Sequence, residues 1–243
     1  MQRQIVITGS ASGIGASTAA LLWAQGHRVI GVDRADAEIV ADLSTEAGCT
    51  GMARAVAAAA PQGIDAIVAN AGVLEPDALC YAVNYWGAVH TLTMLRPLLA
   101  GSAAPRALVT SSMAANTDVG ELADAVRRGE TRDAPFPGAA YAASKLAVVR
   151  WIRAQAVSTE WAGGGILLNA ICPGVTRTPM GETALRNPAA SGLLASTPLR
   201  RVGEPADIAA VIAILVTAEC SFLTGQASFV DGGLDALMRP DRV

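Results

Sequence analysis

The 243-residue sequence predicts an α/β protein with a doubly wound, mostly parallel sheet of seven strands and helices on both faces. Two observations carry this prediction. Short β-branched segments alternate with longer alanine-rich segments, which is the pattern of right-handed βαβ crossovers. The short segments are also almost continuously apolar, as in residues 64–69, where only Asp65 interrupts the run. Strands that are buried on both faces have this composition.

The predicted elements follow one another in a regular order along the chain. Strands are expected at residues 4–8, 28–33, 38–41, 64–69, 106–111, 165–171 and 226–230. Helices are expected at residues 14–25, 46–59, 77–99, 141–161 and 205–218. No Pro/Ser-rich linker and no repeat divides this series, so residues 1–243 are expected to form a single domain.

Composition and charge exclude several classes of protein. The net charge is −3, the pI is near 5.4 and no basic cluster occurs, which argues against nucleic acid or an anionic membrane as the main partner. The longest apolar stretch, residues 208–218, is about half of the ~20 residues that span a bilayer. Residues 1–4 run directly into an apolar strand, which leaves no room for a signal peptide. We expect a cytoplasmic protein.

Cysteine and histidine usage agrees with that expectation. The four cysteines are scattered without a Cys-x-x-Cys pair and are expected to be reduced thiols. His27 and His90 are the only histidines and lie far apart in the sequence, so no metal site is expected.

A glycine-rich segment follows the first predicted strand and opens the first predicted helix. Its sequence is Thr8-Gly9-Ser10-Ala11-Ser12-Gly13-Ile14-Gly15. The glycines permit a tight turn and let a diphosphate approach backbone N–H groups at a helix N-terminus, where the helix dipole also favours anions. An ordinary turn is the alternative for such glycines alone, but the strand-turn-helix context and a following acid, Asp33, indicate a dinucleotide-binding loop.

Asp33 ends the second predicted strand. A carboxylate there accepts hydrogen bonds from the adenosine ribose hydroxyls and repels a 2′-phosphate, so it selects NAD over NADP. Arg34 would weaken that selection, but a solvated surface arginine is the favoured interpretation because Ser12 gives the glycine loop no second base. Asp42 and Leu43 follow the third strand and are expected at the adenine; a helix cap is the alternative for Asp42.

Lys145 is the only lysine of the chain, since the other 17 of its 18 basic residues are arginine. It stands four residues after Tyr141, which in a helix puts the phenol and the ammonium on one face. A nearby positive charge favours phenolate, so Lys145 is expected to lower the pKa of Tyr141 from about 10 toward neutrality. Such a tyrosine is an acid or base near pH 7. The alternative is a surface lysine that stands beside a core tyrosine by chance.

Several motifs occur in a fixed order along the chain. They are the glycine loop, Asn70-Ala71-Gly72, Asn84, Ser111-Ser112, Tyr141-x-x-x-Lys145 and Pro173-Gly174. In this order the sequence resembles the classical short-chain dehydrogenase/reductase family over essentially its whole length. Segments 36–38, 41–45 and 231–240 make it most similar to the bacterial 3α-hydroxysteroid dehydrogenase/carbonyl reductase group. The resemblance implies a Rossmann fold, NAD as cofactor and interconversion of a secondary alcohol and a ketone.

The resemblance also implies a catalytic set. Tyr141 would exchange a proton with the substrate oxygen, and Ser112, rather than Ser111, would hold that oxygen by a hydrogen bond. Lys145 would hold the nicotinamide ribose and lower the tyrosine pKa. Asn84 would position a water that links Lys145 to solvent. Stabilisation of a helix packed on the sheet is a compatible alternative for Asn84.

The implied cofactor-binding residues lie in loops at strand ends. Asn70 and Gly72 would let the backbone pass close to the adenosine ribose. Thr176 and Thr178 would contact the nicotinamide carboxamide, with a plain loop role as the alternative. The full expected set is Gly9, Ser12, Gly13, Ile14, Gly15, Asp33, Arg34, Asp42, Leu43, Asn70, Ala71, Gly72, Tyr141, Lys145, Pro173, Gly174, Thr176 and Thr178.

The chain departs from the family pattern between Ser112 and Tyr141, which are 29 residues apart, roughly twice the usual interval. The excess lies in an insertion at residues 113–140. Four of its apolar residues follow helical spacing, namely Val119, Leu122, Ala123 and Val126. In the group that the chain resembles, an insertion here is associated with dimers because it obstructs a helix-pairing interface. A homo-oligomer, a dimer ahead of a tetramer, is therefore expected, with a solvated flap as the alternative for the insertion.

Residues 179–204 are expected to form a substrate-binding loop. Their apolar side chains indicate an apolar substrate; these are Met180, Leu185, Leu193, Leu194 and Leu199. The leading expectation is an NAD-dependent dehydrogenase of a bulky, steroid-like secondary alcohol that also works as a carbonyl reductase. The alternatives are a dehydrogenase of aryl or aryl-propenyl alcohols, another ketone reductase, or an inactive NAD-binding sensor.

Overall fold

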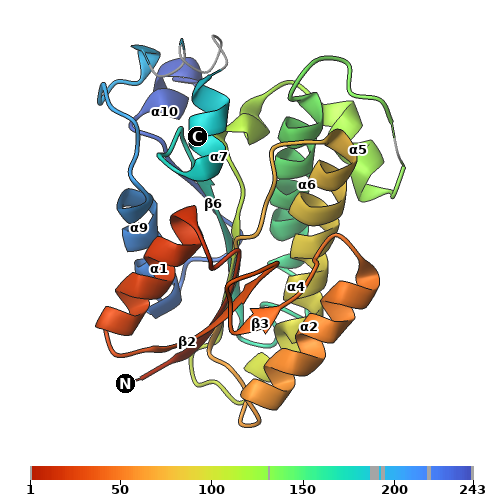
Figure 1. Cartoon of the computed structure of the whole chain (residues 1–243), viewed down its shortest axis with the longest axis vertical. Helices are drawn as coiled ribbons and strands as arrows, with labels where there is room; N and C mark the ends of the chain where they lie inside the picture. Colours follow the sequence, from red (N-terminus) through yellow and green to blue (C-terminus); the bar gives the residue numbers. More distant parts are fainter. Residues whose placement is uncertain (1, 131, 187–191, 193–194, 218–219, 242–243) are drawn as a thin grey trace.

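The computed structural model contains a seven-stranded sheet in the order β3-β2-β1-β4-β5-β6-β7, and every pair of neighbouring strands is parallel (Figure 1). The structure describes residues 2–130, 132–186, 192, 195–217 and 220–241. The strands are β1 (Gln4–Thr8), β2 (Arg28–Asp33), β3 (Ile39–Val40), β4 (Ala66–Ala69), β5 (Arg106–Thr110), β6 (Leu167–Pro173) and β7 (Ala227–Val230). All seven predicted strands are confirmed, and the described sheet is wholly rather than mostly parallel.

The long helices also agree with the prediction. They are α1 (Gly13–Ala24), α2 (Glu46–Ala59), α6 (Ala139–Gln155) and α9 (Pro205–Thr217). The helix predicted at residues 77–99 is composite, with α3 (Asp77–Leu79), the π-helical η1 (Cys80–Gly87), α4 (Ala88–Leu95) and the 3-10 helix η2 (Arg96–Leu99). Helix α6 ends at Gln155 instead of residue 161. Among the residues that the structure describes, none of the helices combines the length and the apolar composition needed to cross a membrane.

Helices cover both faces of the sheet because alternate side chains of each strand enter two different cores. In β1, Val6 belongs to one core, whereas Ile5 and Ile7 belong to the other. Helices α2, α4 and α6 pack in the first core, and α1 and α9 pack in the second. Figure 1 shows these two groups on opposite sides of the strands. A parallel sheet requires this double cover, because its crossover helices lie on its faces.

The strand order reverses between β1 and β4, which are direct neighbours although β2 and β3 lie between them in the sequence. At such a switch point the loops that leave the two strands diverge to opposite faces and open a crevice at the carboxyl edge. Gly9 follows β1 and Asn70 follows β4, so both predicted cofactor loops start at this crevice.

The insertion forms a packed helix, α5 (Gly120–Arg127), with the 3-10 helix η3 (Met113–Asn116) before it. The four residues with helical spacing are all buried in the first core: Val119, Leu122, Ala123 and Val126. Arg150 of α6 donates a hydrogen bond to the Gly120 carbonyl (2.8 Å) and pairs with Asp124 (2.7 Å). The solvated-flap alternative is therefore wrong, because α5 contributes an apolar face to the core.

Truncation of Val126 tests this packing. Val126→Ala removes two buried methyl groups, and we expect it to lower the free energy of unfolding by about 2 kcal/mol. The matched control is Val157→Ala at an exposed site, which should stay within about 0.5 kcal/mol of the wild type. Urea unfolding measures both values, and equal small effects would contradict the packing of α5.

Candidate active site

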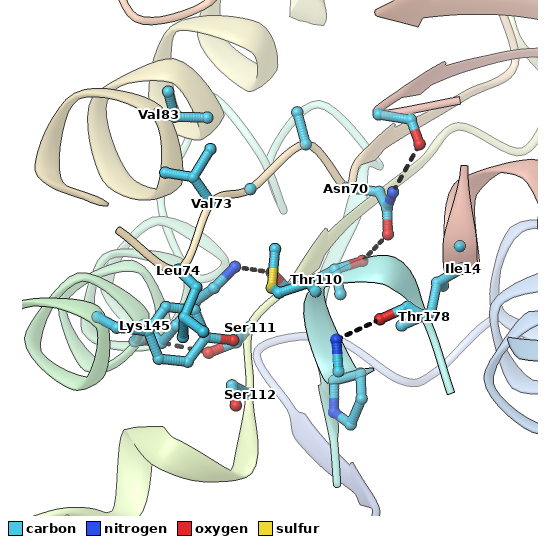
Figure 2. A pocket seen from close by; sticks show the side chains of 18 of the residues that line it. Ile14, Asn70, Val73, Leu74, Val83, Thr110, Ser111, Ser112, Lys145 and Thr178 are labelled. Atoms are coloured by element: carbon cyan, nitrogen blue, oxygen red, sulfur yellow. Dashed lines mark hydrogen bonds between the residues drawn. The ribbon is translucent and has the colours of Figure 1, made fainter. Parts of the chain in front are cut away.

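A cavity of about 860 Å³ opens at the carboxyl edge of the sheet. Its walls come from the loops after β1 to β6, from α7 (Pro179–Leu185) and from the C-terminal helix α10 (Leu234–Met238). Apart from Gly15 and Asn84, every residue of the expected catalytic and cofactor-binding sets lines it. The structure thus brings residues that are as far apart in the sequence as Gly9 and Thr178 to the wall of one cavity. Figure 2 shows a part of this cavity.

The glycine loop is built for close approach. Gly9 and Gly13 have φ angles of +68° and +53°, in the left-handed region that favours glycine. A Cβ on Gly15 would lie 1.9 Å from the Gly9 carbonyl oxygen, so Gly15 serves the packing of α1 against the loop rather than the cavity. The Ser12 side chain makes no cap hydrogen bond to α1, which leaves N–H groups of the first helical turn for an anion. These features fit a bound diphosphate.

Asp33 is held at the end of β2 by two backbone hydrogen bonds. Its Oδ2 accepts from the Ala11 N–H (2.9 Å) and its Oδ1 accepts from the Arg34 N–H (2.7 Å). A carboxylate oxygen accepts more than one hydrogen bond, so both oxygens keep capacity for ribose hydroxyls. Arg34 is exposed and lines the same end of the cavity.

Asp42 does not cap helix α2. Its Oδ1 accepts hydrogen bonds from the Ser44 hydroxyl (2.7 Å) and the Ser44 N–H (2.9 Å), and these bonds lower the pKa of Asp42. The cap is Thr45, whose hydroxyl accepts from the Gly48 N–H at 3.0 Å. The helix-cap alternative for Asp42 is therefore wrong, and Asp42 lines the cavity with Leu43.

Asn70 ties three strand ends together. Its Nδ2 donates to the carbonyls of Thr8 and Gly9, both at 3.2 Å, and its Oδ1 accepts from the Thr110 hydroxyl at 3.0 Å (Figure 2). These contacts join the loops after β1 and β4 to the end of β5. Asn70 thus acts first by fixing the shape of the crevice.

Lys145 is buried at the end of β5, with only 3% of its surface exposed. Its Nζ donates a hydrogen bond to the Thr110 carbonyl (2.9 Å) and lies 5.8 Å from the centre of the Tyr141 ring (Figure 2). The Ser111 hydroxyl donates to the Lys145 carbonyl (2.8 Å), so Ser111 anchors α6. The Ser112 hydroxyl accepts a hydrogen bond from the Ala114 N–H (3.1 Å), and its interaction with the Tyr141 phenol acts to lower the pKa of that group. The surface-lysine alternative is wrong, because the ammonium is enclosed.

Burial moves the pKa of both groups. It lowers the pKa of Lys145 to about 8, because the charged ammonium is removed from water. It raises the pKa of Tyr141 and outweighs the opposing effect of the Ser112 hydrogen bond. The predicted net shift of the Tyr141 pKa toward neutrality is therefore wrong for this geometry, in which desolvation of the phenolate dominates.

Asn84 lies next to the cavity without lining it. In η1 it is buried; its Oδ1 accepts from the Val73 N–H (2.8 Å) and its Nδ2 donates to the Val73 carbonyl (2.9 Å) and the Ser144 hydroxyl (3.1 Å). A Cβ on Gly72 would lie 3.2 Å from Asn84 Oδ1 and 3.3 Å from Lys145 Nζ. Asn84 and the ammonium therefore flank the same glycine, and Asn84 fixes the loop after β4 against α6.

The loop after β6 carries local hydrogen bonds. The Thr176 hydroxyl donates to the Gly174 carbonyl (3.0 Å), and the Thr178 hydroxyl accepts from the Gly181 N–H (2.9 Å) to cap α7. The structure thus assigns loop roles to both threonines, which also line the cavity with Pro173 and Gly174.

Sequence reasoning missed the far walls of the cavity. These are Val73, Leu74, Leu79 and Val83 around η1, then Met113, Ala114, Asn116, Thr117 and Asp118 at and after η3, and Met238 of α10. No spacing signal places them together, since they lie in three distant segments of the sequence. Met180 also lines the cavity, while Leu193 and Leu194 of the expected loop lie outside the described residues. No group of His, Cys, Asp and Glu side chains in the described part of the chain could hold a metal ion.

Known proteins resemble this chain over nearly its full length. The family model for enoyl-(acyl carrier protein) reductase matches residues 9–235. A 3-alpha-hydroxysteroid dehydrogenase/carbonyl reductase of Comamonas testosteroni is 37% identical, over 97% of this chain and 98% of the relative. A cis-4-hydroxycyclohexanecarboxylate dehydrogenase of Sinomonas cyclohexanicum is 32% identical, over 97% of this chain and 98% of the relative. The structure of the 3-alpha-hydroxysteroid dehydrogenase of Pseudomonas sp. B-0831 complexed with NADH matches with TM-score 0.89 at 36% identity, covering 99% of this chain and 100% of that one.

Fold, site and relatives together define an oxidoreductase with a Rossmann-type nucleotide crevice. The chain belongs to the short-chain dehydrogenase/reductase family, whose members bind a nicotinamide cofactor. The resemblance found in its motifs is therefore confirmed.

Replacement of the single lysine tests the site. Lys145→Arg keeps the charge but puts a wide guanidinium where Gly72 and Thr110 closely surround a small ammonium. We expect kcat/KM to fall on the order of a hundredfold, about 2.7 kcal/mol of transition-state stabilisation, with normal folded content by circular dichroism. Tyr141→Phe should cost at least as much. The double variant should lose much less than the two single losses combined, because the residues act as one unit.

The control is Arg153→Lys, a charge-conserving change at an exposed position of the same helix, which should leave kcat/KM unchanged. Near wild-type turnover in Lys145→Arg would refute a catalytic part for the lysine.

Proposed function

We propose that this protein is an NAD(H)-dependent oxidoreductase that interconverts a secondary alcohol and a ketone on a bulky hydrophobic substrate of the 3α-hydroxysteroid/carbonyl class. One observation carries the proposal: Ser112, Tyr141 and Lys145 all line a single cavity. The same cavity extends into the nucleotide crevice, which Asp33 also lines. An inactive NAD-binding sensor would have no need of this intact set.

The substrate oxygen is placed against Ser112 and Tyr141. The Ser112 hydroxyl donates a hydrogen bond to that oxygen, and the Tyr141 phenol gives it a proton in reduction or takes one in oxidation. The raised pKa of Tyr141 keeps the phenol protonated at neutral pH, which suits proton donation to a ketone. A nicotinamide cofactor held in the crevice would give a hydride to the ketone carbon in reduction and accept one from the alcohol carbon in oxidation.

Lys145 and Asn84 support this proton transfer. The ammonium of Lys145 stabilises negative charge on the Tyr141 oxygen as the proton leaves, and it binds ribose hydroxyls in the crevice. Asn84 holds the Gly72 loop beside the ammonium and, with its second Oδ1 lone pair, positions a water for proton relay.

The substrate end of the cavity supports an apolar ligand. Its walls include Leu74, Leu79, Val83, Met180 and Met238. Relatives at 36–37% identity are a 3-alpha-hydroxysteroid dehydrogenase/carbonyl reductase and a 3-alpha-hydroxysteroid dehydrogenase, which favours a fused-ring substrate. A dehydrogenase of aryl or aryl-propenyl alcohols, or another ketone reductase, is the second candidate, because apolar walls also suit a flat aromatic ring.

We further propose a cytoplasmic homodimer. Helix α5 packs against α6 and thereby occupies surface that a helix-pairing interface would need. Ile214 and Phe222 are large apolar side chains that remain exposed and offer another contact surface. Sedimentation equilibrium gives the mass of the assembly independently of its shape, and the mass of a monomer or a tetramer would contradict the dimer.

The proposed substrate class is tested with purified protein and NAD, following the absorbance of the reduced nicotinamide. A panel of 3-hydroxysteroids, terpenoid alcohols and aryl alcohols is compared by kcat/KM. We expect the steroids to be the best substrates, because fused rings contact more of the apolar walls than a single ring does. A clear preference for aryl-propenyl alcohols would support the second candidate, and no turnover with any alcohol or matching ketone would support the sensor.

The cofactor preference is tested at Asp33. We expect at least a tenfold higher kcat/KM with NAD than with NADP, about 1.4 kcal/mol, because the Asp33 carboxylate repels a 2′-phosphate. Asp33→Ala should lower the ratio of kcat/KM with NAD to kcat/KM with NADP. Both cofactors are measured on one preparation of each protein, so differences in folded content do not affect this ratio. Equal use of both cofactors by the wild type would contradict the assignment.

A further inference from the structure

The C-terminal helix α10 lies at the same end of the molecule as α7 (Figure 1). Its last residue, Met238, lines the cavity that also contains Ser112 and Tyr141. The Met238 side chain is 55% exposed, so solvent covers much of it. The position of this wall residue therefore depends on how α10 itself is held.

The start of α10 is fixed against the cofactor loop. Asp231 accepts hydrogen bonds from the Gly233 N–H (2.9 Å) and the Asp235 N–H (2.6 Å), which close the turn before the helix. A Cβ on Gly174 would lie 2.7 Å from the Asp231 Cα, so the two segments are in direct contact. Helix α10 is thus attached to the loop after β6.

The middle of α10 is fixed by the Asp235 carboxylate. Its Oδ1 accepts a hydrogen bond from Asn116 Nδ2 of η3, and it also accepts from Arg239 Nε (2.8 Å) within an ion pair. The Arg239 guanidinium lies 5.4 Å from the centre of the Phe229 ring of β7. The Asp235 side chain is 17% exposed, so these charge-assisted bonds form in a partly dry setting, where they are strongest.

Asp235 itself does not line the cavity, whereas Asn116 and Met238 on either side of it do. An effect of Asp235 on the reaction must therefore act through the groups that it holds. Loss of its carboxylate would remove the bond between α10 and η3, so the end of the helix that carries Met238 would be held only through the start of α10.

We infer that Asp235 is a positioning residue that sets which substrates bind well, by holding α10 so that Met238 forms the outer wall of the substrate end. This inference rests on the proposed function, since it concerns the same cavity. A ketone with several fused rings extends from Ser112 and Tyr141 to this wall and gains contact with it. A single-ring ketone occupies the inner space only.

The test compares two ketones in steady-state reduction with NADH. They are the largest and the smallest that the wild type reduces among a 3-oxosteroid, 2-decalone and cyclohexanone. Asp235→Ala and Met238→Ala should each raise KM for the large ketone five- to tenfold. The kcat for that ketone, KM for NADH and both constants for the small ketone should stay within twofold. A purely structural role of Asp235 would not produce this split.

Two further variants make the test sharper. The double variant Asp235→Ala/Met238→Ala should lose no more than the worse single variant, because Asp235 acts through Met238. Glu130→Ala is the matched control: Glu130 also pairs with arginines, Arg128 and Arg132, but lies outside the cavity lining, so its constants should not change. If Asp235→Ala does not fold, Asp235→Asn is measured in its place beside Met238→Ala. Asp235→Asn should raise KM for the large ketone less than Met238→Ala does.

Three outcomes would overturn the inference. Equal losses for both ketones, a fall in kcat alone, or additive losses in the double variant would each show that Asp235 does not act through the Met238 wall. Failure of the wild type to reduce the steroid while it reduces decalone would remove the steroid assignment only. The decalone and cyclohexanone pair would then still decide the role of Asp235.

Discussion

The parallel direction of all seven strands is the constraint on which the site depends. Parallel strands require crossover connections, so the carboxyl ends of β1, β4, β5 and β6 meet at one edge and their loops leave together. Asn70, which follows β4, converts this proximity into a fixed shape, because it hydrogen-bonds Thr8 and Gly9 at the end of β1 and Thr110 at the end of β5. The crevice that accommodates a dinucleotide is thus a consequence of the sheet topology, made rigid by one amide side chain.

The chain places the ammonium of its single lysine at this edge, at a cost to stability. In the unfolded chain lysine has a pKa near 10.5, and burial lowers that of Lys145 to about 8. Below pH 8 the group is charged in both states and the full desolvation cost is present. Between about pH 8 and 10.5 the unfolded state binds more protons, so this contribution to stability becomes more favourable as pH rises. At neutral pH the folded protein therefore carries a buried charge that lowers its stability.

The two ends of the cavity are built differently. The nucleotide end uses short loops directly after strands, with glycines at Gly9 and Gly13 where the backbone must take a left-handed conformation. The substrate end uses η1, η3, α7 and α10, which come from distant parts of the sequence and are joined by side-chain contacts such as that between Asn116 and Asp235. The walls of the substrate end are joined by a few polar contacts and lie apart from the rigid cofactor site. Substitutions in these walls can therefore change the range of substrates without loss of the fold.

The sequence by itself determined the order and type of the strands and long helices, the cofactor motifs and the packed helix of the insertion. These depend on local patterns, because a strand buried on both faces must be apolar throughout and a packed helix must show apolar residues at helical spacing. Only the tertiary structure decided that burial raises the Tyr141 pKa, that Thr45 rather than Asp42 caps α2, and that Met238 lines the cavity. Desolvation and contacts between distant segments set these properties, and neither is encoded in the spacing of residues along the chain.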